Sequence, residues 1–127
     1  TSLDGENISL NQYRGQVVLI DFWATWCPPC RAEIPGFVSL QDTYRERGFA
    51  MVGVSLDEEG PEVVENFVKQ FNMNYPVAMA TQEILDAYGP ISAIPTTFLL
   101  DRNGKIVKKY VGFEDGKVFE EDVQRLL

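Results

Sequence analysis

Apolar and polar residues follow one another along the chain in blocks whose spacing predicts the secondary structure. Runs rich in β-branched and aromatic residues have the composition of strands, whereas apolar residues that recur every three or four positions indicate helices. The expected strands are 8–10, 17–23, 50–56, 75–79, 96–101 and 105–111, and the expected helices are 28–47, 61–71, 82–88 and 119–127.

Glycine and proline mark the ends of several of these segments. Gly48 suits the position after a helix, Pro61 suits a first helical turn, and Gly89-Pro90 ends the short helix before it. The Asn103-Gly104 pair predicts a hairpin between the last two strands. Strand-helix units followed by an antiparallel pair predict an α/β fold, with one mixed sheet covered by helices on both faces.

Length and composition narrow the picture further. A chain of 127 residues with 45% apolar composition suits a single domain, 1–127, with one substantial core. No stretch approaches the roughly 18 apolar residues of a membrane span. The net charge of −8 argues against nucleic acid and anionic lipid as partners. The first residues, Thr1 to Gly5, have neither the basic nor the apolar part of a signal peptide, so we expect a processed or trimmed chain.

The chain has two cysteines, which lie in the sequence Trp26-Cys27-Pro28-Pro29-Cys30. This stretch joins the predicted strand 17–23 to the predicted helix that follows, which places Cys27 at or near the helix N-terminus. Free backbone N–H groups and the positive end of the helix dipole favour a thiolate there. We therefore predict that Cys27 is the nucleophile and that Cys30, one turn later, is the resolving thiol.

Two structural interpretations compete with redox chemistry at this pair. A disulfide that closes so short a loop removes little entropy from the unfolded chain, about 2 kcal/mol against roughly 4.7 for a 100-residue loop. A zinc site needs four ligands, and the chain offers two cysteines and no histidine. Because a CxxC beside a βαβ pattern is typical of redox motifs, we favour a functional dithiol.

The sequence resembles a known family at two places. Residues 21–30, Asp-Phe-Trp-Ala-Thr-Trp-Cys-Pro-Pro-Cys, and residues 94–98, Ile-Pro-Thr-Thr-Phe, are similar to motifs of thioredoxin-fold proteins. More narrowly, the chain resembles the bacterial TlpA/ResA-like thiol-disulfide oxidoreductases over nearly its whole length. A strand-helix insert around 50–80 separates that branch from plain thioredoxin. The resemblance therefore implies a thioredoxin-like fold that carries this insert.

The resemblance also implies roles for individual residues. Pro95 falls where the family has a cis-proline against the dithiol, and Ile94 falls where substrate backbone docks. Glu33 falls where ResA-like proteins have an acid beside the active site, and Asp21 falls where thioredoxin has a buried aspartate behind the second cysteine. Carrying both acids departs from each parent pattern, so either one remains a candidate for managing the proton of Cys30.

These residues also have ordinary structural interpretations. An Ile-Pro pair can be a plain entry to a strand. Glu33 can be an exposed helix acid, although its i+3 spacing from Cys30 keeps the two on one face. Asp21 lies within an apolar strand, where a carboxyl must stay neutral or find partners. Trp26 beside the nucleophile is expected to line the docking surface, together with Pro28 and Pro29. Trp23 is expected in the core.

The function that we expect is dithiol-disulfide exchange with a protein disulfide through Cys27 and Cys30. It needs no cofactor, because the electrons reside on the two sulfurs. The resemblance implies an extracytoplasmic reductase, periplasmic or membrane-anchored, with the signal or anchor segment absent from this chain. It also implies re-reduction by a membrane thiol-disulfide carrier and a role in cytochrome c maturation, with apocytochrome c as a substrate. We expect a monomer.

Two rival functions use related chemistry. A peroxiredoxin-like thiol peroxidase would have a lone peroxidatic cysteine in a different local pattern, and a peroxide turnover assay distinguishes it. A copper-binding carrier of the same fold would want a histidine beside its cysteines, and a copper titration distinguishes that function.

Overall fold

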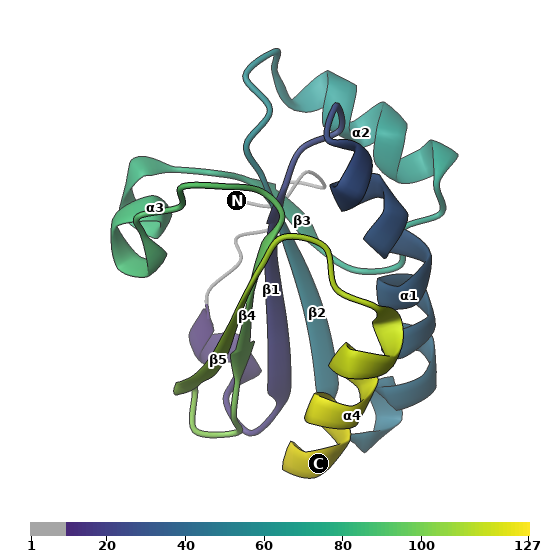
Figure 1. The fold of residues 1–127 in the computed structure, drawn as a ribbon, viewed down its shortest axis with the longest axis vertical. Helices are drawn as coiled ribbons and strands as arrows, with labels where there is room; N and C mark the ends of the chain where they lie inside the picture. The colour runs from purple at the N-terminus through teal and green to yellow at the C-terminus, as the bar shows by residue number, and fades with distance from the viewer. Residues whose placement is uncertain (1–9) are drawn as a thin grey trace.

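The computed structural model describes residues 10–127 of the chain, and within them five strands form one mixed sheet (Figure 1). The strand order is β3-β2-β1-β4-β5, with β2 parallel to β1 and β3, and with β4 antiparallel to β1 and β5. The strands are β1 Val17–Trp23, β2 Phe49–Ser55, β3 Val77–Met79, β4 Thr96–Leu100 and β5 Ile106–Val111. The α/β fold with a mixed sheet is thus confirmed.

In the described part of the chain, four α-helices and two short 3₁₀ helices accompany the sheet. They are η1 Leu10–Tyr13, α1 Pro28–Tyr44, η2 Arg45–Arg47, α2 Pro61–Gln70, α3 Gln82–Tyr88 and α4 Gly116–Leu126. No helix in residues 10–127 combines the length and the apolar character needed to cross a membrane.

The central strand β1 divides two cores. Its alternate side chains Leu19 and Trp23 join a cluster with residues of α1, α2 and α4, whereas Ile20 and Phe22 join a second cluster with Tyr88 of α3. All seven β1 residues are buried, because helices cover both faces of the sheet. The prediction of two covered faces is confirmed, and it leaves the ends of the strands as the places where a site can open.

The boundaries differ from expectation at a few points. The helix predicted over 28–47 ends as an α-helix at Tyr44, and its last residues tighten into η2 before Gly48, whose φ is +94°. The strand expected at 75–79 begins only at Val77. The strand expected at 8–10 is wrong at Leu10, which starts η1, and its other residues lie outside the described part. Phe71 caps α2 instead of extending it.

Candidate active site

The dithiol lies where β1 ends and α1 begins, as the sequence predicts. Cys27 is the N-cap of α1, in extended conformation, and Pro28 and Pro29 occupy the first helical positions. Proline suits those positions because its missing N–H has no intrahelical partner there. The Cys30 N–H donates to the Cys27 Sγ over 3.3 Å. The two cysteines form a disulfide, so this structure is the oxidised form.

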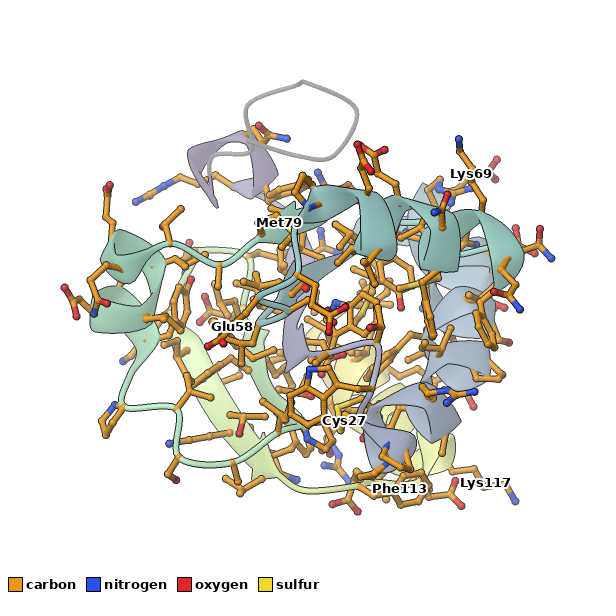
Figure 2. All side chains as sticks on the ribbon, turned by 90° about the horizontal axis from the view of Figure 1, so that it is seen from above. Cys27, Glu58, Lys69, Met79, Phe113 and Lys117 are labelled. Atoms are coloured by element: carbon orange, nitrogen blue, oxygen red, sulfur yellow. A yellow bond between two sulfur atoms is a disulfide. The ribbon has the colours of Figure 1, made fainter. Side chains whose placement is uncertain are left out.

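One side of the disulfide faces the surface. Trp26 is 65% exposed, and both prolines of the active-site turn are exposed as well. Cys27 itself is only 3% exposed and Cys30 is fully buried. In the view from above, Cys27 and the exposed Phe113 lie in the same part of the molecule (Figure 2).

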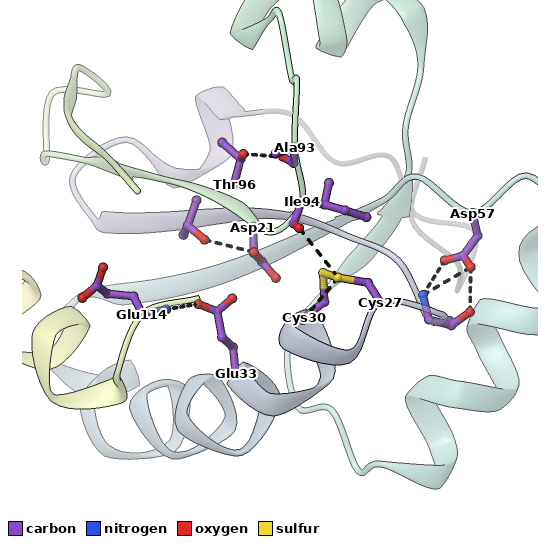
Figure 3. The surroundings of a disulfide bond; sticks show 11 residues. Asp21, Cys27, Cys30, Glu33, Asp57, Ala93, Ile94, Thr96 and Glu114 are labelled. Carbon is purple, nitrogen blue, oxygen red and sulfur yellow. Dashed lines mark hydrogen bonds between the residues drawn. A yellow bond between two sulfur atoms is a disulfide. The ribbon is translucent and has the colours of Figure 1, made fainter. Parts of the chain in front are cut away.

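The loop before β4 covers the disulfide from the other side of the turn. The Ile94–Pro95 peptide bond is cis, as predicted, and the Ile94 carbonyl oxygen lies 3.8 Å from the Cys27 Sγ (Figure 3). Ile94 is half-buried, whereas Pro95 is buried. The Gly112 N–H donates to the Pro95 carbonyl over 2.8 Å, which ties the segment after β5 to this loop.

The sequence interpretation missed two exposed apolar residues beside this hydrogen bond. Val111 and Phe113 flank Gly112 and are 60% and 54% exposed. They are exposed apolar residues next to the segment that is hydrogen-bonded to Pro95, although they lie far from the dithiol along the chain. The available signal was an apolar residue between Gly112 and the acidic Glu114, which is too weak to identify a surface.

Asp21 lies behind the disulfide, in the middle of the buried strand β1. It is 2% exposed, and the Thr97 hydroxyl donates to its Oδ1 over 3.0 Å. Burial raises the pKa of Asp21 from 3.8 to about 7, although the Thr97 hydrogen bond pulls it down. We expected this carboxyl to stay neutral or to find a partner. It does both, because Thr97 is its hydrogen-bond partner and its raised pKa lets it hold a proton near neutral pH.

Glu33 occupies the same buried region, one helical turn after Cys30. It is 4% exposed, so the alternative of an exposed helix acid is wrong. Its Oε2 accepts a hydrogen bond from the Glu114 N–H over 2.9 Å, and its buried Oε1 has no hydrogen-bond partner. Burial, followed by the negative charge of Asp21, raises the pKa of Glu33 from 4.5 to about 8, against the lowering effect of the Glu114 N–H.

The two acids are close enough to influence each other, and the view of Figure 3 shows the Asp21 side chain between Glu33 and the disulfide. Tyr75, before β3, belongs to the same surroundings. Burial and the charges of both acids raise its pKa well above its usual value. Pairs of this kind titrate as a group, and they hold a proton near neutral pH.

Tyr75 also packs beside Trp23 over Gly53 of β2. A Cβ at Gly53 would lie 3.0 Å from the Trp23 Nε1 and 3.5 Å from the Tyr75 Cε2. Glycine at this position therefore leaves room for both rings. The Trp23 Nε1 is buried without a hydrogen-bond partner, and Trp23 is 1% exposed, which confirms its place in the core.

Asp57 is a further buried acid that the sequence interpretation did not single out. Its carboxylate accepts hydrogen bonds from the Thr25 N–H and hydroxyl and from the Ser55 hydroxyl. Asp57 stands in a run of acids with Glu58 and Glu59, which looks like a solvated loop in sequence. In residues 10–127 no group of three or more His, Cys, Asp or Glu side chains is arranged to hold a metal ion.

The fold and the dithiol together define a class of protein, the thiol-disulfide oxidoreductases with a thioredoxin-like fold. The sequence matches the Redoxin family model over residues 1–127, so the chain belongs to the redoxin family. This membership agrees with the resemblance inferred from the CxxC and Ile-Pro motifs.

Named relatives point the same way. The thiol-disulfide oxidoreductase ResA of Bacillus thuringiensis subsp. konkukian is 36% identical over 127 residues, which are 99% of this chain and 72% of that protein. Among solved structures, the thioredoxin-family thiol:disulfide interchange protein of Chlorobium tepidum TLS is 37% identical with a TM-score of 0.92, covering 99% of this chain and 90% of that one. StoA of Bacillus subtilis is 34% identical with a TM-score of 0.80, covering 94% and 90% respectively.

Proposed function

We propose that this thiol-disulfide oxidoreductase reduces protein disulfides outside the cytoplasm, with Cys27 as nucleophile and Cys30 as resolving thiol. The observation that carries the proposal is the placement of Cys27 as the N-cap of α1, between the exposed Trp26 and the carbonyl of Ile94. An extended substrate segment that lies along Ile94 brings its disulfide to Cys27. Trp26, Pro28 and Pro29 supply the apolar contact surface.

The exchange takes two steps on the sulfurs. The Cys27 thiolate attacks a substrate sulfur, a mixed disulfide forms, and the other substrate sulfur leaves as a thiolate that takes up a proton. Cys30 then loses its proton and attacks the Cys27 sulfur, which breaks the mixed disulfide and releases the second substrate thiol. The substrate gains two electrons, and the protein is left as the Cys27–Cys30 disulfide that the structure contains.

The proton of Cys30 needs an acceptor on the buried side of the site. Asp21 and Glu33, with pKa values of about 7 and about 8, are matched to proton transfer near neutral pH. We assign the proton of Cys30 to Asp21, since its side chain lies between Glu33 and the disulfide in Figure 3. Glu33, with its higher pKa, then keeps its own proton while Asp21 exchanges one, so that the pair carries at most one negative charge near neutral pH.

The names of similar proteins support a proposal for the cellular setting. Bacterial proteins named ResA, StoA and DsbE are similar to this chain. We propose an extracytoplasmic location, re-reduction by a membrane thiol-disulfide carrier, and apocytochrome c as a protein substrate. Each catalytic cycle then passes two electrons from the carrier to the substrate.

Trapping the mixed disulfide tests the proposal. The Cys30→Ser variant retains the nucleophile but lacks the resolving thiol, so it should accumulate a covalent adduct with an oxidised apocytochrome c fragment, visible on a non-reducing gel. The matched Cys27→Ser variant should form none. Wild-type protein should also reduce insulin with dithiothreitol as the electron source. Absence of both the adduct and insulin reduction would overturn the proposal.

A further inference from the structure

The carboxylate of Asp57 holds the turn that carries the active-site dithiol. Asp57 follows β2 by two residues and is 9% exposed. Its Oδ1 accepts the Thr25 hydroxyl over 2.6 Å, and both oxygens lie within 3.2 Å of the Thr25 nitrogen (Figure 3). Its Oδ2 also accepts the Ser55 hydroxyl over 2.6 Å. Hydrogen bonds to a carboxylate are roughly twice as strong as those between neutral groups.

These bonds act at the point where the chain leaves the sheet. Trp23 is the last residue of β1 and pairs with Ser55 of β2, and the Leu56 N–H still donates to the Trp23 carbonyl over 2.8 Å. After Trp23 the backbone turns toward α1 and has no further strand partner. Thr25 lies in this turn, two residues before Cys27, and its N–H and hydroxyl bind Asp57 in place of a neighbouring strand.

The exposed residue of the turn is Trp26, which stands directly between Thr25 and Cys27. In the proposed function a protein substrate contacts Trp26 and Cys27 together, so the position of one relative to the other matters for docking. A small disulfide needs only the sulfur. A change in the backbone position of this turn should therefore affect a protein substrate more than a small disulfide.

We propose that Asp57 is a positioning residue for protein substrates: by binding Thr25 it sets the turn that presents Trp26 and Cys27 to a protein disulfide. The inference rests on the proposed reductase function and deepens it. Asp57 does not touch the sulfurs in this scheme. It acts through Thr25, and its loss weakens docking without weakening the attacking thiolate.

The decisive variant is Asp57→Asn, which keeps the size of the side chain but leaves one acceptor oxygen for three donors. Its matched control is Glu58→Gln, which removes the same charge from the next residue, whose side chain is exposed. Both are assayed with insulin as a protein disulfide and with 5,5′-dithiobis(2-nitrobenzoic acid) as a small one. Thermal unfolding of each variant checks that it is folded.

Asp57→Asn should lower kcat/KM for insulin roughly tenfold, less than the hundredfold that a misplacement of 1 Å can cost. Its rate with the small disulfide should stay within about twofold of wild type, as should both rates of Glu58→Gln. A merely structural role would lower both rates together. An equal loss on both substrates, or no loss on insulin, would overturn the proposal.

A second variant decides the matter if Asp57→Asn does not fold. Thr25→Val removes the hydroxyl donor but keeps the N–H, so it should show a smaller loss, about threefold, confined to insulin. In the double variant the losses should combine to less than their product, because both act through one contact. An unselective loss in Thr25→Val would overturn the positioning role. If wild-type protein reduced no insulin and the Cys30→Ser variant trapped no adduct, the proposed function itself would fail, which is a different outcome.

Discussion

The two cysteines of the disulfide lie in different environments, one next to exposed apolar residues and the other next to buried acids. On the Cys27 side lie Trp26 and the active-site prolines, all exposed, at the end of the molecule. On the Cys30 side lie two buried carboxyls with raised pKa values. A single helical turn separates the two environments. The comparison shows that one short motif can place a surface for substrate contact and a buried site for proton transfer on its two sides. This requires a fold that exposes one end of the motif and buries the other.

The largest expected effect concerns the buried side and stability. Asp21 and Glu33 have raised pKa values in the folded protein, so the folded state binds more protons than the unfolded state between about pH 4 and pH 8. Stability is therefore lost as pH rises through that window. For Asp21 alone, the two pH units from 5 to its pKa of about 7 correspond to roughly 3 kcal/mol.

Urea unfolding of the oxidised protein at pH 5 and pH 9 measures this effect. Asp21→Asn should lose markedly less stability than wild type between the two values, and Glu33→Gln should behave in the same direction. The exposed Glu58→Gln should follow wild type. If Asp21→Asn and wild type lost equal stability, the carboxyl would not carry a proton in the folded state near neutral pH.

The next effect concerns the exposed side. In the reduced protein, iodoacetamide at neutral pH should label Cys27 at least about tenfold faster than Cys30, because the helix N-terminus favours the Cys27 thiolate and Cys30 is fully buried. Peptide mapping by mass spectrometry gives both rates. Equal or reversed labelling would contradict the assignment of nucleophile and resolving thiol.

A smaller effect links the two sides. In Asp21→Asn and Glu33→Gln, the pH profile of substrate reduction should move by at least about half a unit, or roughly 0.7 kcal/mol, if these acids manage the Cys30 proton. We expect the larger movement in Asp21→Asn. Profiles that stay in place in both variants would remove the proton role from both acids and leave them as structural groups.

The smallest effect sharpens the exposed side. Pro28 and Pro29 offer no N–H to the sulfur, so the Cys30 N–H is the donor that the structure shows on Cys27. Pro28→Ala restores one donor and should lower the Cys27 pKa by a few tenths of a unit. The reduction potential should rise with it, by ~10 mV. A Cys27 pKa that stays or rises in Pro28→Ala would mean that the prolines act through shape alone.

Much of the site can be predicted from short stretches of the sequence. The apolar run 17–23, the cysteine spacing and the prolines after Cys27 predict a strand, a turn and a helix N-terminus, and all three form as expected. Asn103-Gly104 predicts the hairpin of β4 and β5 for the same kind of reason. These features depend on backbone preferences within a few residues, which a sequence displays directly.

Other features arise only when distant segments meet. The Thr97 hydroxyl that binds Asp21 comes from 76 residues away, and the Glu114 N–H that binds Glu33 comes from 81 residues away. Glu33 can be a surface acid along its own helix, but in the fold it is 4% exposed and the segment after β5 supplies its hydrogen bond. Asp57 looks like a loop acid, and only the pairing of β1 with β2 brings it to Thr25.

The sequence by itself therefore determined where the sulfurs stand and which of them begins a helix. The tertiary structure decided which carboxyls share their surroundings, which groups they bind and how deeply they are buried. Burial depends on everything that packs around a side chain, whereas capping and turn formation depend on its immediate neighbours. That is why the cysteine at the helix N-terminus could be predicted from a pentapeptide, and why the raised pKa values of Asp21 and Glu33 needed the whole fold.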